Sequence, residues 1–258
     1  MKNLLFYCLL FAACFLQSCS VISEITYFKD ATSTSLVDID AKQTLSMVKA
    51  FAIDSSGEKG SLEELEKLPK TWTSFYEIQK KDGSLPKNPD SIKLLKRAFM
   101  KSNFENDELS GFSLKLERFS AQDYKNFDKM NEGKREKIQL EKQMFTDWDG
   151  KKLTIDINDL NFDNMDELLK EKEEDENLSS EEIKQKKEQV KAMMQMFDMK
   201  MMTTLKFENK IKNISGKHEW FQKIDDHSVK INFDFKKMFD EKPSDNSTDK
   251  GKIIITTE

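Results

Sequence analysis

Hydrophobic and polar residues alternate along the chain with two periods, and each period predicts a different element. A period of two residues is typical of a strand with one buried face, whereas a period of about 3.6 residues is typical of a helix with one apolar face. The two periods follow one another several times, which predicts strands interleaved with helices. The predicted strands span residues 25–28, 35–39, 72–78, 111–119, 143–148, 151–157, 203–214, 228–235 and 252–257, and the predicted helices span 42–52, 90–102, 122–140 and 179–202.

Turn and cap residues mark the ends of several of these elements. Asp149-Gly150 separates two predicted strands and is a residue pair that a two-residue type I′ hairpin turn prefers. Ser179 and Glu182 have the spacing of a capping box, which begins a helix. The strand 252–257 contains three consecutive isoleucines, which predicts burial on both of its faces.

Together these elements predict an α+β fold, with a largely antiparallel sheet of about eight strands and three or four helices packed on one face. A chain of this length can hold one large domain or two small ones, and no internal repeat divides it. We predict a single domain over residues 25–258. Its polar segments near 54–70, 163–178 and 241–250 are predicted to be mobile connections.

The N-terminus has the features of an export signal. Lys2 supplies a positive charge, and residues 4–16 form an almost unbroken apolar run. This run is shorter than the roughly 20 residues that span a bilayer, but it suits a signal peptide. It ends in Leu16-Gln17-Ser18-Cys19, which resembles the bacterial lipobox. The resemblance implies that residues 1–18 are a lipoprotein signal peptide and that Cys19 carries palmitate-type acyl chains.

The alternative is an ordinary secretory signal that leaves one unused cysteine. With acyl chains on Cys19, residues 19–24 would be the lipidated N-terminus and tether, and two chains suffice for stable anchoring. Ser20, rather than an aspartate, follows Cys19, which resembles lipoproteins that are sorted to the outer membrane. The resemblance implies a Bacteroidetes-like outer-membrane lipoprotein that faces the periplasm.

A second resemblance lies in the C-terminal part of the chain. Lys210-Ile211, Ser215-Gly216 and the run Asp226-His227-Ser228-Val229 follow the strand, turn and returning strand of uncharacterised lipoproteins with an LppM-type domain. In this chain His227 stands where those proteins have a turn glycine. The resemblance implies an envelope lipoprotein with an α+β domain, and it brings no catalytic residue with it.

Composition removes several classes of function. All three cysteines lie within the first nineteen residues, so the rest of the chain has no disulfide, thiol nucleophile or cysteine metal site. The 42 basic and 47 acidic side chains give a net charge of −5, which does not fit a nucleic-acid-binding protein. No Gly-x-Gly or Gly-x-Ser-x-Gly occurs, so neither a nucleotide cofactor nor a nucleophile elbow is indicated.

The most unusual feature is a cluster of methionines near the end of the predicted helix 179–202. The cluster consists of Met193, Met194, Met196, Met199, Met201 and Met202. Methionine fills cores, lines adaptable apolar grooves and binds Cu(I), and we favour packing because no histidine or cysteine accompanies the cluster. His218 and His227 lack the spacing of zinc ligands, so we predict no metal site.

Two functions follow from these observations. The first is a non-catalytic, membrane-tethered lipoprotein that acts as a binding or structural module for an envelope protein or component. The second is a binder or carrier of lipid or another apolar ligand, with a cavity under the helix 179–202. Such a cavity would be lined by Met193, Met194, Phe197 and Met201. No cofactor is predicted, and an enzyme is disfavoured because no sequence motif marks a catalytic group.

Overall fold

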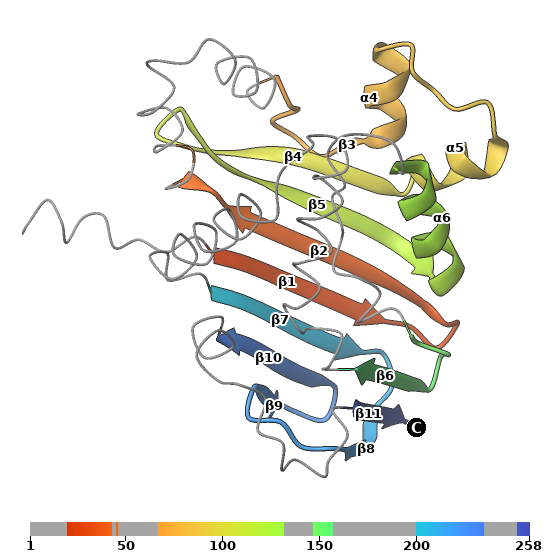
Figure 1. The fold of residues 1–258 in the computed structure, drawn as a ribbon, viewed down its shortest axis with the longest axis vertical. Helices are drawn as coiled ribbons and strands as arrows, with labels where there is room; N and C mark the ends of the chain where they lie inside the picture. Colours follow the sequence, from red (N-terminus) through yellow and green to blue (C-terminus); the bar gives the residue numbers. More distant parts are fainter. Residues whose placement is uncertain (1–19, 43–44, 46–66, 132–146, 157–199, 235–251) are drawn as a thin grey trace, which may run out of the picture.

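The computed structural model describes residues 20–42, 45, 67–131, 147–156, 200–234 and 252–258. Most of its strands form one eight-stranded sheet (Figure 1). From one edge to the other, the strands of this large sheet are β3 (Thr73–Ser74), β4 (Ala98–Glu105), β5 (Glu108–Ser120), β2 (Thr32–Asp40), β1 (Ser20–Tyr27), β7 (Lys200–Phe207), β10 (Ser228–Asp234) and β9 (Phe221–Lys223).

A second sheet has three strands in the order β6 (Lys152–Asp156), β11 (Lys252–Thr257) and β8 (Ile211–Ser215). The helices of the described residues are α4 (Phe75–Lys81), α5 (Pro89–Leu95) and α6 (Ala121–Asn131). Figure 1 shows the helices beside β4 and β5, at one end of the large sheet, and the small sheet near β10 and β9, at the other end. The predicted α+β class is therefore correct, but the strands belong to two sheets.

The large sheet is antiparallel except where β1 runs parallel to β7. This parallel pair lies at the centre of the sheet, with Ile25 opposite Leu205 and Tyr27 opposite Phe207. All four side chains are buried. Alternate residues of a strand point to opposite faces, so these pairs define an inner face of the sheet.

The small sheet covers this inner face over β1, β7 and β10. The cluster between the two sheets combines Trp148 with Ile25, Tyr27, Leu205, Phe207, Val229, Ile231 and Phe233 from the large sheet and Leu153, Ile155, Ile211, Ile253 and Ile255 from the small one. Ser23 and Thr203 lie on the same face, fully buried, and their hydroxyl oxygens are 2.7 Å apart in a hydrogen bond. These two hydroxyl groups therefore satisfy each other away from water.

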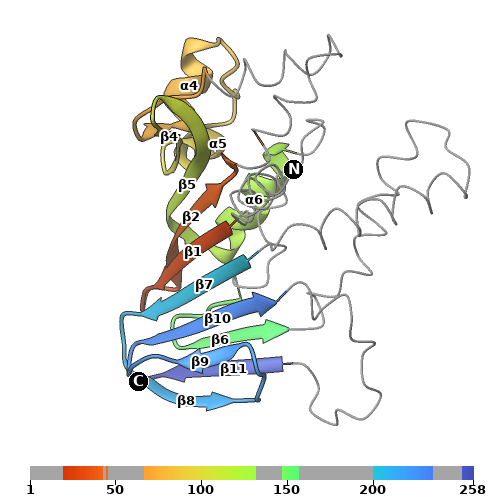
Figure 2. The ribbon, with the colours of Figure 1, turned by 90° about the vertical axis from the view of Figure 1, so that its left-hand side faces the viewer.

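A second cluster lies under the helices. Leu94 and Leu95 of α5, Phe127 of α6, and Ala98, Leu116 and Phe119 of the sheet are its buried members. Ser35 pairs with both Ile25 and Leu116, so the two clusters lie on the same face of the large sheet. Figure 2 shows the sheet from its edge, with α6 on one side of it.

Several predicted strands and turns are confirmed. The hairpin of residues 25–28 and 35–39 is β1 and β2, the strand 111–119 lies within β5, and the paired strands near 203 and 228 are β7 and β10. Strand 252–257 is β11, but only its alternate residues Ile253, Ile255 and Thr257 are buried, because one of its faces lies against the core and the other does not.

The segment 72–78, which the alternation of its residues predicts to be a strand, is mostly a helix because a capping residue starts one. Only Thr73–Ser74 is strand, and α4 begins directly afterwards. The Ser74 hydroxyl accepts a hydrogen bond from the Glu77 amide at 3.2 Å, which is the cap of a helix. The helix predicted at 90–102 ends at Leu95, and Phe99 lies in β4, because pairing with β5 extends the chain from Ala98 onward.

The type I′ hairpin turn occurs elsewhere than predicted. Asn106 and Asp107 have φ of 51° and 64° and join the paired residues Glu105 and Glu108. Positive φ at both central residues defines a type I′ turn. At Asp149-Gly150 only Gly150 has positive φ, at 97°, and the Asp149 carboxylate instead accepts the amides of Lys151 and Lys152.

Other predictions differ from the structure or concern residues that it does not describe. The predicted strand 203–214 breaks after Phe207, since the chain there crosses from β7 to β8 in the other sheet. The helix 179–202 cannot reach its predicted end, because β7 begins at Lys200. β1 begins at Ser20, so residues 20–24 belong to the sheet and not to a tether. The first part of the helix predicted at 122–140 is confirmed, since α6 spans Ala121–Asn131. The rest of that helix, most of the helix 42–52, and the segments 54–66, 163–178 and 241–250 lie outside the described residues.

Trp148 joins the two sheets and offers a test of their packing. Its ring lies 5.3 Å from the ring of Tyr27 and 5.6 Å from that of Phe207, and its Nε1 donates to the Phe28 carbonyl at 2.7 Å. Trp148→Phe keeps an aromatic ring but removes the donor, so we expect the free energy of unfolding to fall by about 1–3 kcal/mol in denaturant titrations. Trp220→Phe is the control, because Nε1 of Trp220 has no hydrogen-bond partner among the described residues. Equal losses in the two variants would contradict this role.

Candidate functional site

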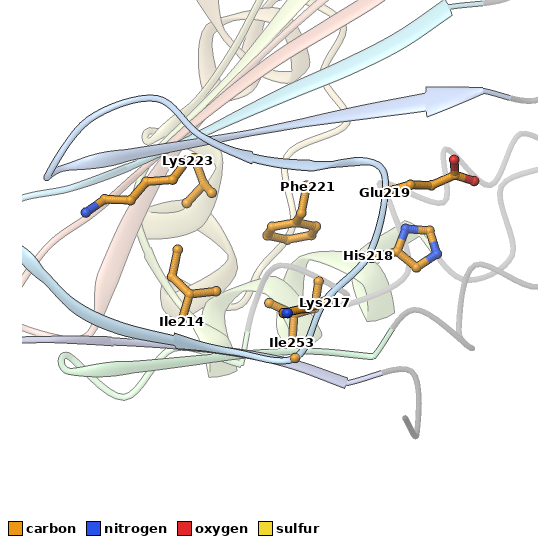
Figure 3. Close-up of a pocket in the computed structure, with 9 residues that line it drawn as sticks. Ile214, Lys217, His218, Glu219, Phe221, Lys223 and Ile253 are labelled. Carbon is orange, nitrogen blue, oxygen red and sulfur yellow. The ribbon is translucent and has the colours of Figure 1, made fainter. Parts of the chain in front are cut away.

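A pocket of about 470 Å³ opens between the two sheets at the end of the sandwich (Figure 3). Strands β9 and β10 form one wall, and β8 and β11 form the other. The lining residues are Ile214, Gly216, Lys217, His218, Glu219, Phe221, Lys223, Val229 and Ile253. Pockets for small ligands span roughly 300–1,000 Å³, so this one is large enough for a ligand.

The floor of the pocket is apolar. Val229 and Ile253 are fully buried and belong to the core between the sheets, and Ile214 and Phe221 are half-buried against that core. In Figure 3 the Phe221 ring points from its own strand toward the side of the pocket that carries Ile214 and Ile253. An apolar group that enters the pocket would therefore displace water from these apolar side chains, which is favourable.

Charged and polar side chains surround the opening. Lys217, His218 and Glu219 follow one another in the segment between β8 and β9, and Lys223 lies at the end of β9. The Lys223 ammonium is 3.1 Å from a carboxylate oxygen of Asp226. The rim therefore has two ammonium groups, one of them paired with Asp226, and the Glu219 carboxylate around an apolar floor, which suits a ligand with an apolar body and a negatively charged end.

His218 is held in its neutral form at this rim. Its Nδ1 accepts a hydrogen bond from the backbone amide of Trp220 at 3.3 Å, and its ring lies 4.3 Å from the Trp220 ring. Burial lowers the pKa of His218, and the nearby Glu219 opposes this effect. With Nδ1 as the acceptor, the remaining proton is on Nε2, which makes His218 a neutral donor beside the pocket.

Trp220 leaves one polar atom without a partner. Its ring packs against His218 and, at 5.7 Å, against Phe233, and its Nε1 is buried without a hydrogen-bond partner among the described residues. Its two neighbours in the sequence, Glu219 and Phe221, both line the pocket. A buried donor without a partner costs free energy, so a ligand acceptor or a water that reached it would stabilise the site.

Two turns position the lining residues. Gly216 has φ of 90°, and a Cβ at this position would collide with the Lys252 carbonyl oxygen. Only glycine lets the chain leave β8 so close to β11. In the other turn the Asp225 carboxylate accepts the His227 amide at 2.7 Å, and this bond lowers the pKa of Asp225. The residues that resemble an LppM-type domain therefore build the turns on either side of the pocket.

The candidate residues from the sequence are not brought together at this pocket. Met201 lies in β7, half-buried against the core between the sheets, because it alternates with the buried Thr203 and Leu205. Cys19, Met193, Met194 and Phe197 lie outside the described residues. Among the residues that the structure describes, no three His, Cys, Asp or Glu side chains are placed to hold a metal ion. No helix in those same ranges has the length and apolarity needed to cross a membrane.

No protein-family model matches the chain, and no curated protein matches it either. Among solved structures, the chain is similar to the folded domain of LppM from Mycobacterium tuberculosis, determined by NMR. The sequences are 8% identical, the TM-score is 0.35, and the match covers 93% of this chain and 90% of that one.

The neutral state of His218 predicts a pH dependence of stability. The pKa in the folded protein lies below the ordinary value of 6.5, so the unfolded chain takes up the proton first as the pH falls. The contribution of the neutral His218 to the free energy of unfolding is therefore complete above about pH 6.5. It is lost as the pH falls through 6.5 toward the lowered pKa. We expect the free energy of unfolding, measured by denaturant titration, to fall less between a pH above 6.5 and a pH below 6.5 in His218→Gln than in the unchanged protein. The glutamine keeps an acceptor for the Trp220 amide but does not titrate. An unchanged pH slope would contradict the neutral state.

Proposed function

We propose that the protein is a non-catalytic, membrane-tethered binding module that holds an amphipathic ligand between its two sheets. The pocket between the sheets carries this proposal, because it combines an apolar floor with a rim that contains two lysines. The tether is the lipid on Cys19 that the lipobox implies. A Bacteroidetes-like outer-membrane location facing the periplasm belongs to the same proposal and rests on the sequence resemblance alone.

The apolar part of the ligand would lie against Phe221, Ile214 and Ile253. These side chains point toward the pocket in Figure 3 and are continuous with the buried core. A pocket of about 470 Å³ favours part of an acyl chain or a ring system over a whole membrane lipid. In this proposal the apolar ligand lies at the β9 edge of the large sheet, and not under the methionine-rich helix that the sequence suggested.

The polar end of the ligand would meet the rim. Lys217 favours an anionic group, Lys223 shares its charge with Asp226, and the neutral His218 adds a hydrogen-bond donor without adding a charge. Glu219 lies beside them and lowers the net positive charge of the rim. A ligand with one phosphate or carboxylate on an apolar body satisfies this arrangement.

Dodecyl phosphate is a probe with this chemistry. We expect it to bind the purified chain in calorimetric titrations, and dodecyltrimethylammonium, which has the same tail and the opposite charge, to bind at least several-fold more weakly. Phe221→Glu places a carboxylate on the apolar floor and should abolish binding, since a buried charge without a partner is strongly unfavourable. Lys217→Gln should weaken binding of the phosphate about fivefold, which corresponds to about 1 kcal/mol for one exposed charge.

Lys206→Gln is the matched control for this measurement. Lys206 forms an ion pair with Glu24 at 2.7 Å on the other face of the sheet, away from the pocket. Its loss should leave the affinity for dodecyl phosphate unchanged. Equal effects of Lys206→Gln and Lys217→Gln, or equal affinities for the two detergents, would contradict the proposed polarity of the site.

The tether is tested separately. The acyl chains require the Cys19 sulfur, so Cys19→Ser should release the protein from the membrane fraction of the cells that express it. Fractionation by ultracentrifugation followed by immunodetection measures the partition. Cys14→Ser, a second cysteine in the same N-terminal segment, is the control and should leave the partition unchanged. Retention of Cys19→Ser in the membrane fraction would show that the protein is not anchored in this way.

A further inference from the structure

The outer face of the large sheet, opposite the two clusters of the core, has its own pattern of exposed side chains. Ser23, Ile25 and Tyr27 of β1 point to the inner face and are buried, so Ile22 and Glu24 point outward. Ile22 is 48% exposed, which is unusual for a large aliphatic side chain in the middle of a sheet. In Figure 2 this face is turned away from α6.

The register places Ile22 in a row that crosses the sheet. It pairs with Met202 of β7 on one side and with Asp38 of β2 on the other. Asp38 pairs with Ser113, and Ser113 pairs with Lys101 of β4. Directly opposed residues share a face, so the whole row points outward. Ile22 and Lys101 are three strands apart, which is about 14 Å at ~4.8 Å per strand.

Trp72 extends this row past Lys101. Its indole is 38% exposed, and the ammonium groups of Lys101 and Lys115 each lie 5.3 Å from its ring. Lys115 also forms an ion pair with Glu117 at 2.7 Å.

Among the described residues, Ile22, Trp72 and Ile224 are the large hydrophobic side chains that are most exposed, and the first two are in this row. We define the outer patch as Ile22, Trp72, Lys101, Lys115 and Met202.

The acidic groups near the outer patch already have partners. The Asp38 carboxylate accepts a hydrogen bond from the Ser113 hydroxyl, and Glu24 is paired with Lys206. The basic groups shown to reach Trp72 on this face are Lys101 and Lys115. The outer patch therefore combines exposed apolar groups with two lysines.

The start of β1 fixes where this patch lies relative to the lipid anchor. Ser20 is the first residue of the strand and directly follows Cys19. At ~3.3 Å per residue, the backbone of Ile22 is only about 10 Å from that of Cys19. No flexible linker separates the anchor from the sheet, so acyl chains on Cys19 would hold the outer patch close to the bilayer surface.

We propose that the outer patch rests on the lipid bilayer, with Ile22, Met202 and Trp72 at the level of the headgroups and Lys101 and Lys115 on anionic lipid phosphates. The proposal rests on the tether at Cys19 that is part of the proposed function. Tryptophan favours the membrane interface, because its ring is apolar and its N–H is polar. Lysine lays its apolar stem along such a surface and keeps its ammonium among the headgroups. Anionic lipids attract lysines that lie within a Debye length of the surface.

The test joins the protein to a membrane chemically, so it does not depend on acylation in cells. A chain that begins at Cys19 retains every described residue and has one thiol, because Cys8 and Cys14 are absent from it. This thiol is coupled to a maleimide lipid in vesicles of equimolar phosphatidylcholine and phosphatidylglycerol. A nitroxide on the lipid headgroups then quenches the fluorescence of tryptophans that lie at the membrane surface.

We expect the nitroxide to quench the coupled protein and Trp72→Phe to lose most of this quenching. Trp220→Phe is the matched control and should retain it, since Trp220 lies at the other edge of the sheet. In vesicles of phosphatidylcholine alone, and in the double variant Lys101→Gln and Lys115→Gln, the quenching should fall at least twofold. Equal quenching of Trp72→Phe and the unchanged protein, or no quenching of either, would overturn the proposal. Either result would leave the binding of dodecyl phosphate to the pocket unaffected, so the two proposals can fail independently.

Discussion

The structure depends on burying the inner faces of β1 and β7, the parallel pair at the centre of the large sheet. Parallel strands are normally covered on their faces, and here the small sheet covers one of them through Tyr27, Phe207 and Trp148. The Trp148 donor reaches the carbonyl of Phe28, just past the end of β1. Without this cover, the apolar side of the pair would be exposed, and the two strands would lose the main contribution to their stability.

The same packing explains which parts of the fold the sequence could predict. Alternation over residues 111–119 and the hairpin of 25–28 and 35–39 are local patterns, and both strands occur where expected. The division into two sheets is not local. Phe207 and Ile211 are separated by three residues that carry the chain from one sheet to the other, and nothing in the alternation distinguishes this crossing from a continuous strand. The helix at Phe75 was missed because its aromatic residues favour strands, although Ser74 and Glu77 have the spacing of a capping box.

The candidate site shows a similar division. The turns at Gly216 and Asp225 could be predicted, and they are the residues that resemble an LppM-type domain. Which side chains the turns bring together could not be predicted, because Ile253 reaches the pocket from β11 of the small sheet, whereas Phe221 and Val229 come from the large sheet. The spacing of His218 in the sequence bears only on metal binding, whereas its contact with Trp220 and its burial determine its protonation state. The methionine cluster stands out in the composition, yet Met201 is a half-buried strand residue packed against the core.

One strand connects the two proposals. Because successive residues of β1 point to opposite faces, Ile25 and Tyr27 join the core that forms the floor of the pocket, and Ile22 joins the outer patch. A shift of register by one residue would exchange these roles and destroy both surfaces. The pairing of Ile25 with Leu205 and with Ser35 fixes the register on both sides. A sheet that lies on a membrane through its outer face would therefore present the opposite face, with the small sheet and the pocket, away from the lipid. In that arrangement the pocket would receive a ligand from the solvent or from a partner and not directly from the bilayer beneath the sheet.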